Sequence, residues 1–328
     1  MKTQFRWFSA PKAKQTLGVG SETFMLGASS QPVQNFNLNP WFVTGFTDAE
    51  GSFNVIVAKS NNVELQWQSR LFFQISLHVK DKILLEQIKN YFGVGEIYIK
   101  TSDSIIYSVK SIKDLTIIIN HFEKYPLITQ KCADYEIWKQ AFILIKNKEH
   151  LTLDGLNKIV ALKAAMSGWG LSEVLKTAFS AIVPVTKPLV KNKVVPHPSW
   201  LAGFASGEGC FFVDVYKSKA RKQGMGVKLL FKLTQHSRDE YLMNSFINYF
   251  NCGNVYKFKQ ACDYKVVKIS DIQEKIINFF KNYPILGVKS KDFEDFCLVS
   301  ELLKKKLTTD NLEKIIKIKK GMNKGRIS

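Results

Sequence analysis

The sequence is poor in acidic residues compared with basic ones. It contains 28 Asp and Glu against 47 Lys and Arg, which gives a formal net charge of +19 at pH 7. Because 45% of its residues are hydrophobic and 12% are aromatic, the chain can build a packed core, and an intrinsically disordered protein is excluded. Clustered Lys and Arg gain free energy by displacing counterions from phosphates. We therefore expect nucleic acid as the partner, with scattered surface charge as the alternative.

The chain also lacks a long apolar run and the cysteine spacing of a metal or disulfide framework. Residues 23–47 carry no charge, but their Asn, Gln and Pro make them too polar to cross a bilayer. The five cysteines are odd in number and show no close pairs, so we expect buried thiols in a reducing compartment. Five scattered histidines argue against a histidine-rich metal site. These absences exclude a membrane protein and a disulfide-stabilised one.

An internal repeat organises most of the chain. Three blocks return 158 residues later: NPWFVTGFTDAEGSF (39–53) as HPSWLAGFASGEGCF (197–211), HVKDKILLEQIKNYFGVGEIY (78–98) as HSRDEYLMNSFINYFNCGNVY (236–256), and HFEKYPLI (121–128) as FFKNYPIL (279–286). Two copies of one domain are therefore joined in tandem. We place the N-terminal domain at 36–170 and the C-terminal domain at 196–328.

Two segments lie outside the repeat. Residues 171–195 contain Pro184 and Pro188, which suit a linker between the domains. Residues 1–35 form a leader with basic residues and no acid before Glu22. This leader resembles an organellar transit segment or translated upstream exon sequence, and an ordinary flexible tail is the alternative. The first interpretation places the protein in mitochondria.

Each copy is expected to be an α+β domain: a helix, two long strands, a helix, two shorter strands and one or more helices. Residues 52–60 alternate, with Phe53, Val55 and Val57 on one face. Residues 70–78 alternate in the same way, and residues 81–92 have helical spacing. One face of each sheet therefore needs a cover of helices, and the other face is polar or aromatic and basic.

Small residues are spaced four apart in the first helix of each copy. Gly45 and Ala49 form one such pair, and Gly203 and Gly207 form the other. Small side chains allow two helices to approach more closely than the usual 8–10 Å between axes. We expect the two helices to pack together as a pseudo-twofold pair, which brings their C-terminal ends together.

Glu50 and Glu208 occupy these helix ends, and each is followed by a glycine that suits a helix terminus. Two carboxylates close to each other and to the negative ends of helix dipoles are hard to ionise. A hard divalent cation such as Mg²⁺ would compensate, because it prefers oxygen ligands. A single glutamate at a helix end usually faces solvent, but its recurrence at matching positions favours a metal site.

The segments VTGFTDAEG (43–51) and LAGFASGEG (201–209) resemble the two motifs of single-chain LAGLIDADG homing endonucleases. The resemblance covers almost the whole chain after the leader. It implies tandem αββαββα domains with the motif helices at a pseudo-twofold interface, and antiparallel sheets that form a DNA-binding saddle over the major groove. It also implies a monomeric enzyme that hydrolyses one phosphodiester on each strand of a long asymmetric DNA site.

The resemblance assigns the eighth motif position, Glu50 and Glu208, as the metal ligands, together with the preceding residues Ala49 and Gly207. It implies Mg²⁺ as the cofactor, with Mn²⁺ as a substitute and Ca²⁺ supporting binding without cleavage. The sixth position is acidic in the first copy, Asp48, but not in the second.

Three further side chains carry over from the resemblance as catalytic residues. Lys131 and Lys289 follow the proline blocks and would stabilise charge on the phosphate or tune the attacking water. A lysine after a turn is usually only solvated, so the residue pattern alone leaves this role open. Gln235 would order active-site water, whereas its counterpart Leu77 cannot form a hydrogen bond.

The outward faces of the long strands are expected to read DNA in the major groove, where each base pair presents a distinct pattern. The residues in this set are Ser52, Asn54, Ile56, Ala58, Ser60, Arg70, Gln74, Ser76, Phe212, Asp214, Tyr216, Ser218, Lys228, Lys232 and Thr234. The principal alternative is an RNA maturase that helps a group I intron to splice, with or without nuclease activity. The two glutamates favour cleavage, because a protein that only binds nucleic acid does not need two mutually repelling carboxylates.

Overall fold

The computed structural model describes residues 38–166, 170–190, 194–221, 224–304, 307–323 and residue 326. The expected leader, residues 1–35, lies outside the described residues. Within these described ranges, no helix has both the length and the apolar character needed to span a membrane.

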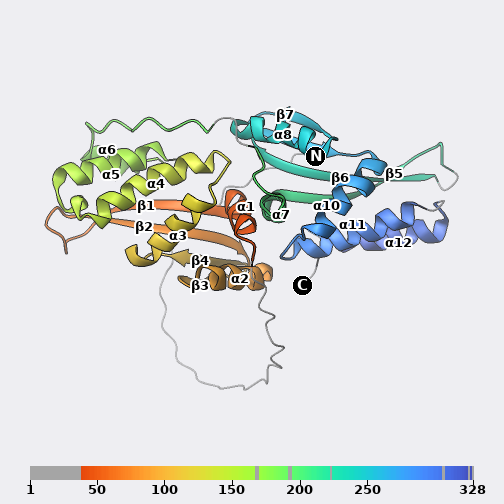
Figure 1. The fold of residues 1–328 in the computed structure, drawn as a ribbon, viewed down its shortest axis with the longest axis horizontal. Helices are drawn as coiled ribbons and strands as arrows, with labels where there is room; N and C mark the ends of the chain where they lie inside the picture. Colours follow the sequence, from red (N-terminus) through yellow and green to blue (C-terminus); the bar gives the residue numbers. More distant parts are fainter. Residues whose placement is uncertain are drawn as a thin grey trace, which may run out of the picture. The chain divides into compact units, whose positions relative to one another are not determined.

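The first repeat contains one four-stranded sheet and the helices around it (Figure 1). Its elements are α1 (Pro40–Glu50), β1 (Gly51–Lys59), β2 (Trp67–His78), η1 (Val79–Asp81), α2 (Lys82–Phe92), β3 (Glu96–Thr101), β4 (Ser104–Val109), α3 (Ile112–Lys124), α4 (Lys131–Lys146), η2 (Glu149–Leu151), α5 (Leu153–Ala165) and α6 (Glu173–Ala178). The short helix α6 lies in the segment expected to be a linker.

The second repeat follows the same order up to its fourth strand, after which three short helical segments take the place of α3. Its elements are α7 (Pro198–Glu208), β5 (Gly209–Lys217), β6 (Met225–His236), η3 (Ser237–Asp239), α8 (Glu240–Phe250), β7 (Asn254–Phe258), β8 (Ala261–Val266), α9 (Ile269–Asp271), η4 (Ile272–Ile277), α10 (Asn278–Asn282), α11 (Lys289–Leu303) and α12 (Thr309–Lys320). The expected tandem αββαββα organisation is confirmed, and each copy carries additional helices after it.

Both sheets are antiparallel and have the same topology, β1-β2-β4-β3 and β5-β6-β8-β7. The alternation predicted for β1 is confirmed, because Phe53, Val55 and Val57 are buried. Helices α3, α4 and α5 pack against β1 and β2 on this inner face. Strand β2 begins at Trp67, before the expected start at 70, because its ladder with β1 continues until Lys59 pairs with Trp67.

The two copies differ by one residue in the second hairpin. The pairing of β3 with β4 is irregular between Ile99 and Thr101, whereas the pairing of β7 with β8 is regular. The hairpin of the second copy is shorter by one residue, so equivalent positions of the two copies are shifted by one residue after it. Segment η4 is a π-helix, whose wider turn accommodates one extra residue. The original spacing of 158 is restored before the proline block of the second copy.

The cysteines agree only in part with the expectation of buried thiols. All five lie in the described ranges, where they are thiols and not disulfides, and Cys252 and Cys262 are buried. Cys132, Cys210 and Cys297 are partly exposed, which corrects the expectation for these three. They lie on helices α4 and α11 and on the polar face of β5, where the packed core does not cover them completely.

Helices α1 and α7 pack directly against each other, as the small residues predict. A Cβ atom on Gly45 would lie 1.9 Å from the backbone oxygen of Trp200, and one on Gly203 would lie 2.1 Å from the backbone oxygen of Phe42. Only glycine permits backbones to approach this closely. The contact joins the two repeats through their motif helices.

Candidate active site

The packed helices bring Glu50 and Glu208 to one place at their C-terminal ends. A Cβ atom added to Gly207 would lie 2.4 Å from Ala49 Cβ and 3.1 Å from Glu50 Cγ. Each glutamate is the last residue of its helix, and the following glycine begins the first long strand. The carboxylates therefore sit where the helix pair meets the two sheets.

Burial and mutual repulsion make these carboxylates hard to ionise. Burial raises the pKa of Glu208 to about 7, and repulsion from Glu50 adds to the effect. Burial also raises the pKa of Glu50, although Lys131 and Lys289 oppose the rise. Two negative charges here need nearby positive charge, as the sequence suggested. The main cause is loss of solvent rather than the helix dipole.

Lys131 and Lys289 bind the C-terminal ends of the motif helices. Lys131 Nζ donates to the backbone oxygens of Thr47 at 2.9 Å and Ala49 at 3.0 Å. Lys289 Nζ donates to the backbone oxygen of Gly207. Burial lowers the pKa of both lysines, while Glu50 and Glu208 oppose this change. The lysines thus complement the helix dipoles and the glutamate pair at once.

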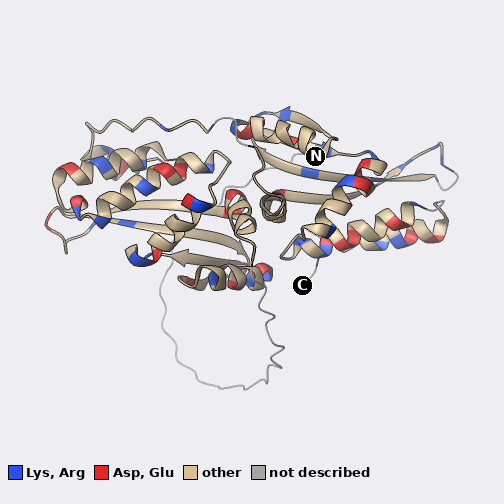
Figure 2. Cartoon of the chain, viewed as in Figure 1, with Lys and Arg blue, Asp and Glu red and all other residues tan. Residues whose placement is uncertain are grey.

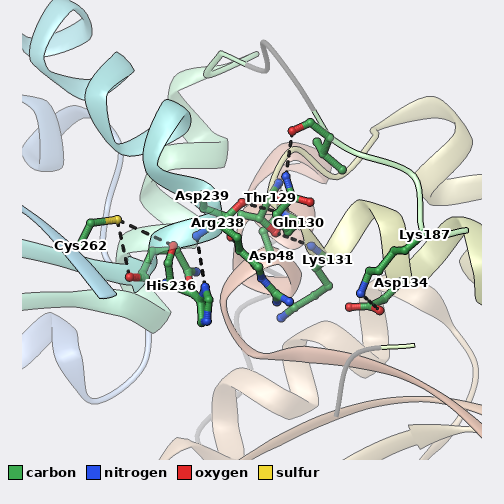
Figure 3. A network of polar contacts seen from close by, with 12 residues as sticks. Asp48, Thr129, Gln130, Lys131, Asp134, Lys187, His236, Arg238, Asp239 and Cys262 are labelled. Carbon is green, nitrogen blue, oxygen red and sulfur yellow. Dashed lines mark hydrogen bonds and ion pairs between the residues drawn. The ribbon is translucent and has the colours of Figure 1, made fainter. Parts of the chain in front are cut away.

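The sixth motif position holds the proline-block turn in both copies, and Figure 3 shows Asp48 of the first copy beside Thr129. Asp48 accepts hydrogen bonds from the backbone N–H groups of Ile128 and Thr129, and from the Trp200 indole at 2.8 Å. Ser206 Oγ accepts from the backbone N–H of Leu286 at 3.0 Å. Serine can therefore replace the acid, because the position needs a hydrogen-bond acceptor.

One cavity collects parts of both repeats around Glu50. It has a volume of about 760 Å³, and its lining includes Leu77 and Asp81 from the first repeat and Gly207 and Lys289 from the second. Glu50 thus shares a cavity with the lysine of the other repeat. Sequence reasoning could not reveal this exchange, because the repeat spacing relates equivalent residues and not contacting ones.

Gln235 lies beside the other glutamate. Its amide nitrogen is 3.5 Å from Glu208 Oε1, and its amide oxygen accepts from the backbone N–H of His236. The equivalent position in the cavity around Glu50 is the apolar Leu77. The two glutamates therefore have chemically different neighbours at this position.

The expected DNA-reading residues lie on the sheet faces opposite the core, and none of them is buried. Ser52, Arg70, Ser76, Phe212, Tyr216 and Lys228 are exposed, and Asn54, Ile56, Ala58, Gln74, Asp214, Lys232 and Thr234 are partly exposed. Ser60 and Ser218 lie just beyond the ends of β1 and β5. The polar face thus carries side chains able to donate and to accept hydrogen bonds.

Sequence reasoning missed the part of this face that the shorter strands supply. Thr234 pairs with Asp263 on β8, and Thr234 Oγ1 donates to its carboxylate at 2.7 Å. Lys265 binds the same carboxylate at 3.0 Å and lies over the ring of Tyr256 on β7. On the first sheet, Gln74 Nε2 contacts the Tyr98 hydroxyl at 3.4 Å. The predicted hairpins located these strands, but their pairing with β2 and β6 was not readable from the sequence.

Basic side chains outnumber acidic ones on the strands (Figure 2). The strands carry Lys59, Arg70, Lys100, Lys217, Lys228, Lys232, Lys257 and Lys265 against Glu96, Asp214 and Asp263. The strands of the two sheets therefore carry a net positive charge, as the whole chain does.

Comparison with known proteins gives consistent matches. The family model described as LAGLIDADG endonuclease matches residues 43–142 and 201–300. A Neurospora crassa protein named "Probable intron-encoded endonuclease 3" is 40% identical over 85% of this chain and 53% of its own length. The chain thus spans about half the length of this relative.

Solved structures match over nearly their whole length. The structure of the I-SmaMI LAGLIDADG homing endonuclease bound to cleaved DNA matches with a TM-score of 0.86 and 44% sequence identity. The match covers 88% of this chain and 98% of the I-SmaMI chain. I-SmaMI bound to an uncleaved DNA target in the presence of calcium ions has the same TM-score and identity, and covers 88% of this chain and 100% of its own. With both motifs matched in tandem, this chain belongs to the LAGLIDADG endonuclease family.

Proposed function

We propose that the protein is a monomeric, sequence-specific DNA endonuclease that cuts both strands of a long asymmetric site. The observation that carries the proposal is the pair of partly buried glutamates at the end of the α1–α7 contact, flanked by two partly buried lysines. Structural packing alone gives no reason to place two repelling carboxylates together. Hydrolysis of a phosphodiester gives such a reason.

The polar faces of the two sheets are the proposed DNA interface. Antiparallel strands fit the major groove, and the side chains of this face match the groups that bases present there. Arg70, Lys228 and Lys232 would contact guanine edges or phosphates, whereas Gln74 and Asn54 would contact adenine. Because the two faces carry different residues at equivalent positions, the DNA site is expected to lack twofold symmetry.

The donor set at the centre fits a hard divalent cation. Glu50 and Glu208 offer carboxylate oxygens, and the backbone oxygens of Ala49 and Gly207, which accept from Lys131 and Lys289, each keep a second lone pair. Within the described residues, no three His, Cys, Asp or Glu side chains group as a metal site, so water and DNA phosphates would complete the ligand set. When bound, Mg²⁺ would supply Lewis acidity toward the phosphate and lower the pKa of water.

The remaining residues would position and stabilise the reacting groups. Lys131 and Lys289 would place an ammonium group near the charge that develops on each phosphate. Gln235 would orient the attacking water beside Glu208, a function that Leu77 cannot supply beside Glu50. The two strands would therefore be cut at unequal rates.

The related structures support the choice of partner and cofactor. I-SmaMI was solved with its DNA target and with calcium ions. We assign double-stranded DNA as the partner and Mg²⁺ as the cofactor of this chain, with Mn²⁺ as a substitute. The Neurospora crassa relative is named as intron-encoded. We accordingly propose an intron-encoded protein that acts in mitochondria.

A cleavage assay on intron-less insertion-site DNA tests the function. The full chain should convert a duplex with the site to two fragments in Mg²⁺, and should bind without cutting in Ca²⁺ or EDTA. A duplex with an unrelated sequence is the control. Tight binding to group I intron RNA without any cleavage of the DNA would instead support the maturase alternative.

A further inference from the structure

Two equivalent acids, Asp81 and Asp239, end the short 3-10 helices that follow the second long strand of each repeat. They occupy the N-cap positions of α2 and α8, where an Asp side chain usually accepts a hydrogen bond from its own helix. In the part of the chain that the structure describes, neither acid caps its own helix in this way. Their carboxylates are directed elsewhere.

Each carboxylate crosses to the other repeat. Asp81 Oδ1 accepts from the backbone N–H of Val288 at 2.7 Å. Asp239 Oδ1 accepts from the backbone N–H of Gln130 at 2.6 Å, a contact seen in Figure 3. Val288 and Gln130 are equivalent residues, so the two hydrogen bonds follow the pseudo-twofold relation of the repeats.

The receiving residues are the N-caps of α11 and α4, the helices that begin with Lys289 and Lys131. Neither N-cap side chain bonds to its own helix within the described structure. The positive end of each helix dipole therefore receives a carboxylate from the other repeat, which is a stabilising arrangement. The acids thus hold the first turn of each lysine-bearing helix.

The close approach of Asp81 also restricts which residue can occupy position 287. Gly287 has φ +73°, and a Cβ atom there would lie 2.5 Å from Asp81 Oδ1. Any larger residue would displace the carboxylate or the turn. Together with Glu50 and Lys289, Asp81 lines the cavity of about 760 Å³. The hydrogen bond thus lies at the candidate active site and not in a remote part of the interface.

We infer that Asp81 and Asp239 are positioning residues that act reciprocally: each repeat fixes the lysine of the other repeat against the glutamate pair. Asp81 fixes Lys289, which lines the cavity together with Glu50, and Asp239 fixes Lys131, which binds the backbone oxygens of Thr47 and Ala49. This inference rests on the proposed endonuclease function. Its particular consequence is that each acid controls the cleavage of one strand.

Strand-resolved single-turnover cleavage of an end-labelled target tests the inference. Asp81→Ala and Asp239→Ala should each slow the cutting of one strand by about 3- to 30-fold, the range expected for a lost helix cap, and the two variants should affect opposite strands. Asp81→Asn and Asp239→Asn keep an acceptor oxygen and should restore most of the rate. Affinity for the target in Ca²⁺ should change by less than about threefold for all four variants, because neither acid belongs to the DNA-reading set on the sheet faces.

Ser111→Ala is the matched control, because Ser111 caps α3 through the backbone N–H of Asp114 at 3.1 Å and lies outside the cavity lining. It should lower the melting temperature without changing either strand's rate. Equal slowing of both strands by each alanine variant, or unchanged rates in folded variants, would overturn the positioning role. Wild-type protein that binds the target but never cuts in Mg²⁺ would instead refute the proposed function.

Discussion

At the scale of single residues, the glutamate pair combines poor solvation with mutual repulsion. In the folded chain the pKa of Glu208 is raised to about 7, whereas in the unfolded chain it has the ordinary value of 4.5. Between these two pKa values the unfolded state binds fewer protons than the folded state. The contribution of Glu208 to stability therefore decreases as the pH rises through this window.

Glu208→Gln removes this loss, so the metal-free variant should be more stable than wild type at pH 7.5, by about 1–3 kcal/mol, and should match wild type at pH 5. Urea unfolding at both pH values measures the difference. Glu64→Gln, in an exposed loop, is the control and should follow the wild-type curve. Parallel pH dependences for wild type and Glu208→Gln would show that Glu208 is not strained by burial.

Gln235 and Leu77 give a second prediction at this scale. Gln235→Leu removes a group beside Glu208 that can orient water, and should slow the faster strand by roughly 5- to 150-fold. Leu77→Gln introduces such a group beside Glu50 and should speed up the slower strand. Strand-resolved rates measure both effects. Equal strand rates in the wild-type enzyme would contradict this source of asymmetry.

At the scale of elements, the contact between α1 and α7 depends on backbone approach. Gly45→Ala places a methyl group 1.9 Å from a backbone oxygen that cannot rotate away, and should cost at least about 2 kcal/mol of unfolding free energy. Gly321→Ala is the matched control, since the nearest atom there is 3.5 Å from the added carbon. Chemical denaturation compares the two variants. Equal stabilities would mean that the helices separate easily.

The elements also show what the sequence could and could not predict. The repeat, the alternation in β1 and the paired glycines predicted the order of elements and the helix contact, because these patterns are local or recur. The exchange between repeats was not predictable, since Asp81 and Val288 lie 207 positions apart and share no pattern. The β8 residues Asp263 and Lys265 were missed for the same reason, because only the sheet order places them beside β6.

At the scale of the whole molecule, the net charge of +19 governs nonspecific DNA binding. Affinity for a duplex without the target site should fall steeply between 50 and 200 mM salt, with a log–log slope of several units, because each phosphate contact releases counterions. Fluorescence anisotropy at several salt concentrations measures the slope. A slope near zero would mean that phosphates are not contacted.

The most direct test of the account is cleavage by Glu50→Gln and Glu208→Gln in Mg²⁺, with binding to the same duplex measured in Ca²⁺. If both glutamates hold the cation, each variant should lose double-strand cleavage, because an amide has no negative charge and only one of the two carboxylate oxygens. Affinity in Ca²⁺ should stay near the wild-type value, since the sheet faces are unchanged. Double-strand cleavage at wild-type rate by either variant would contradict the assignment.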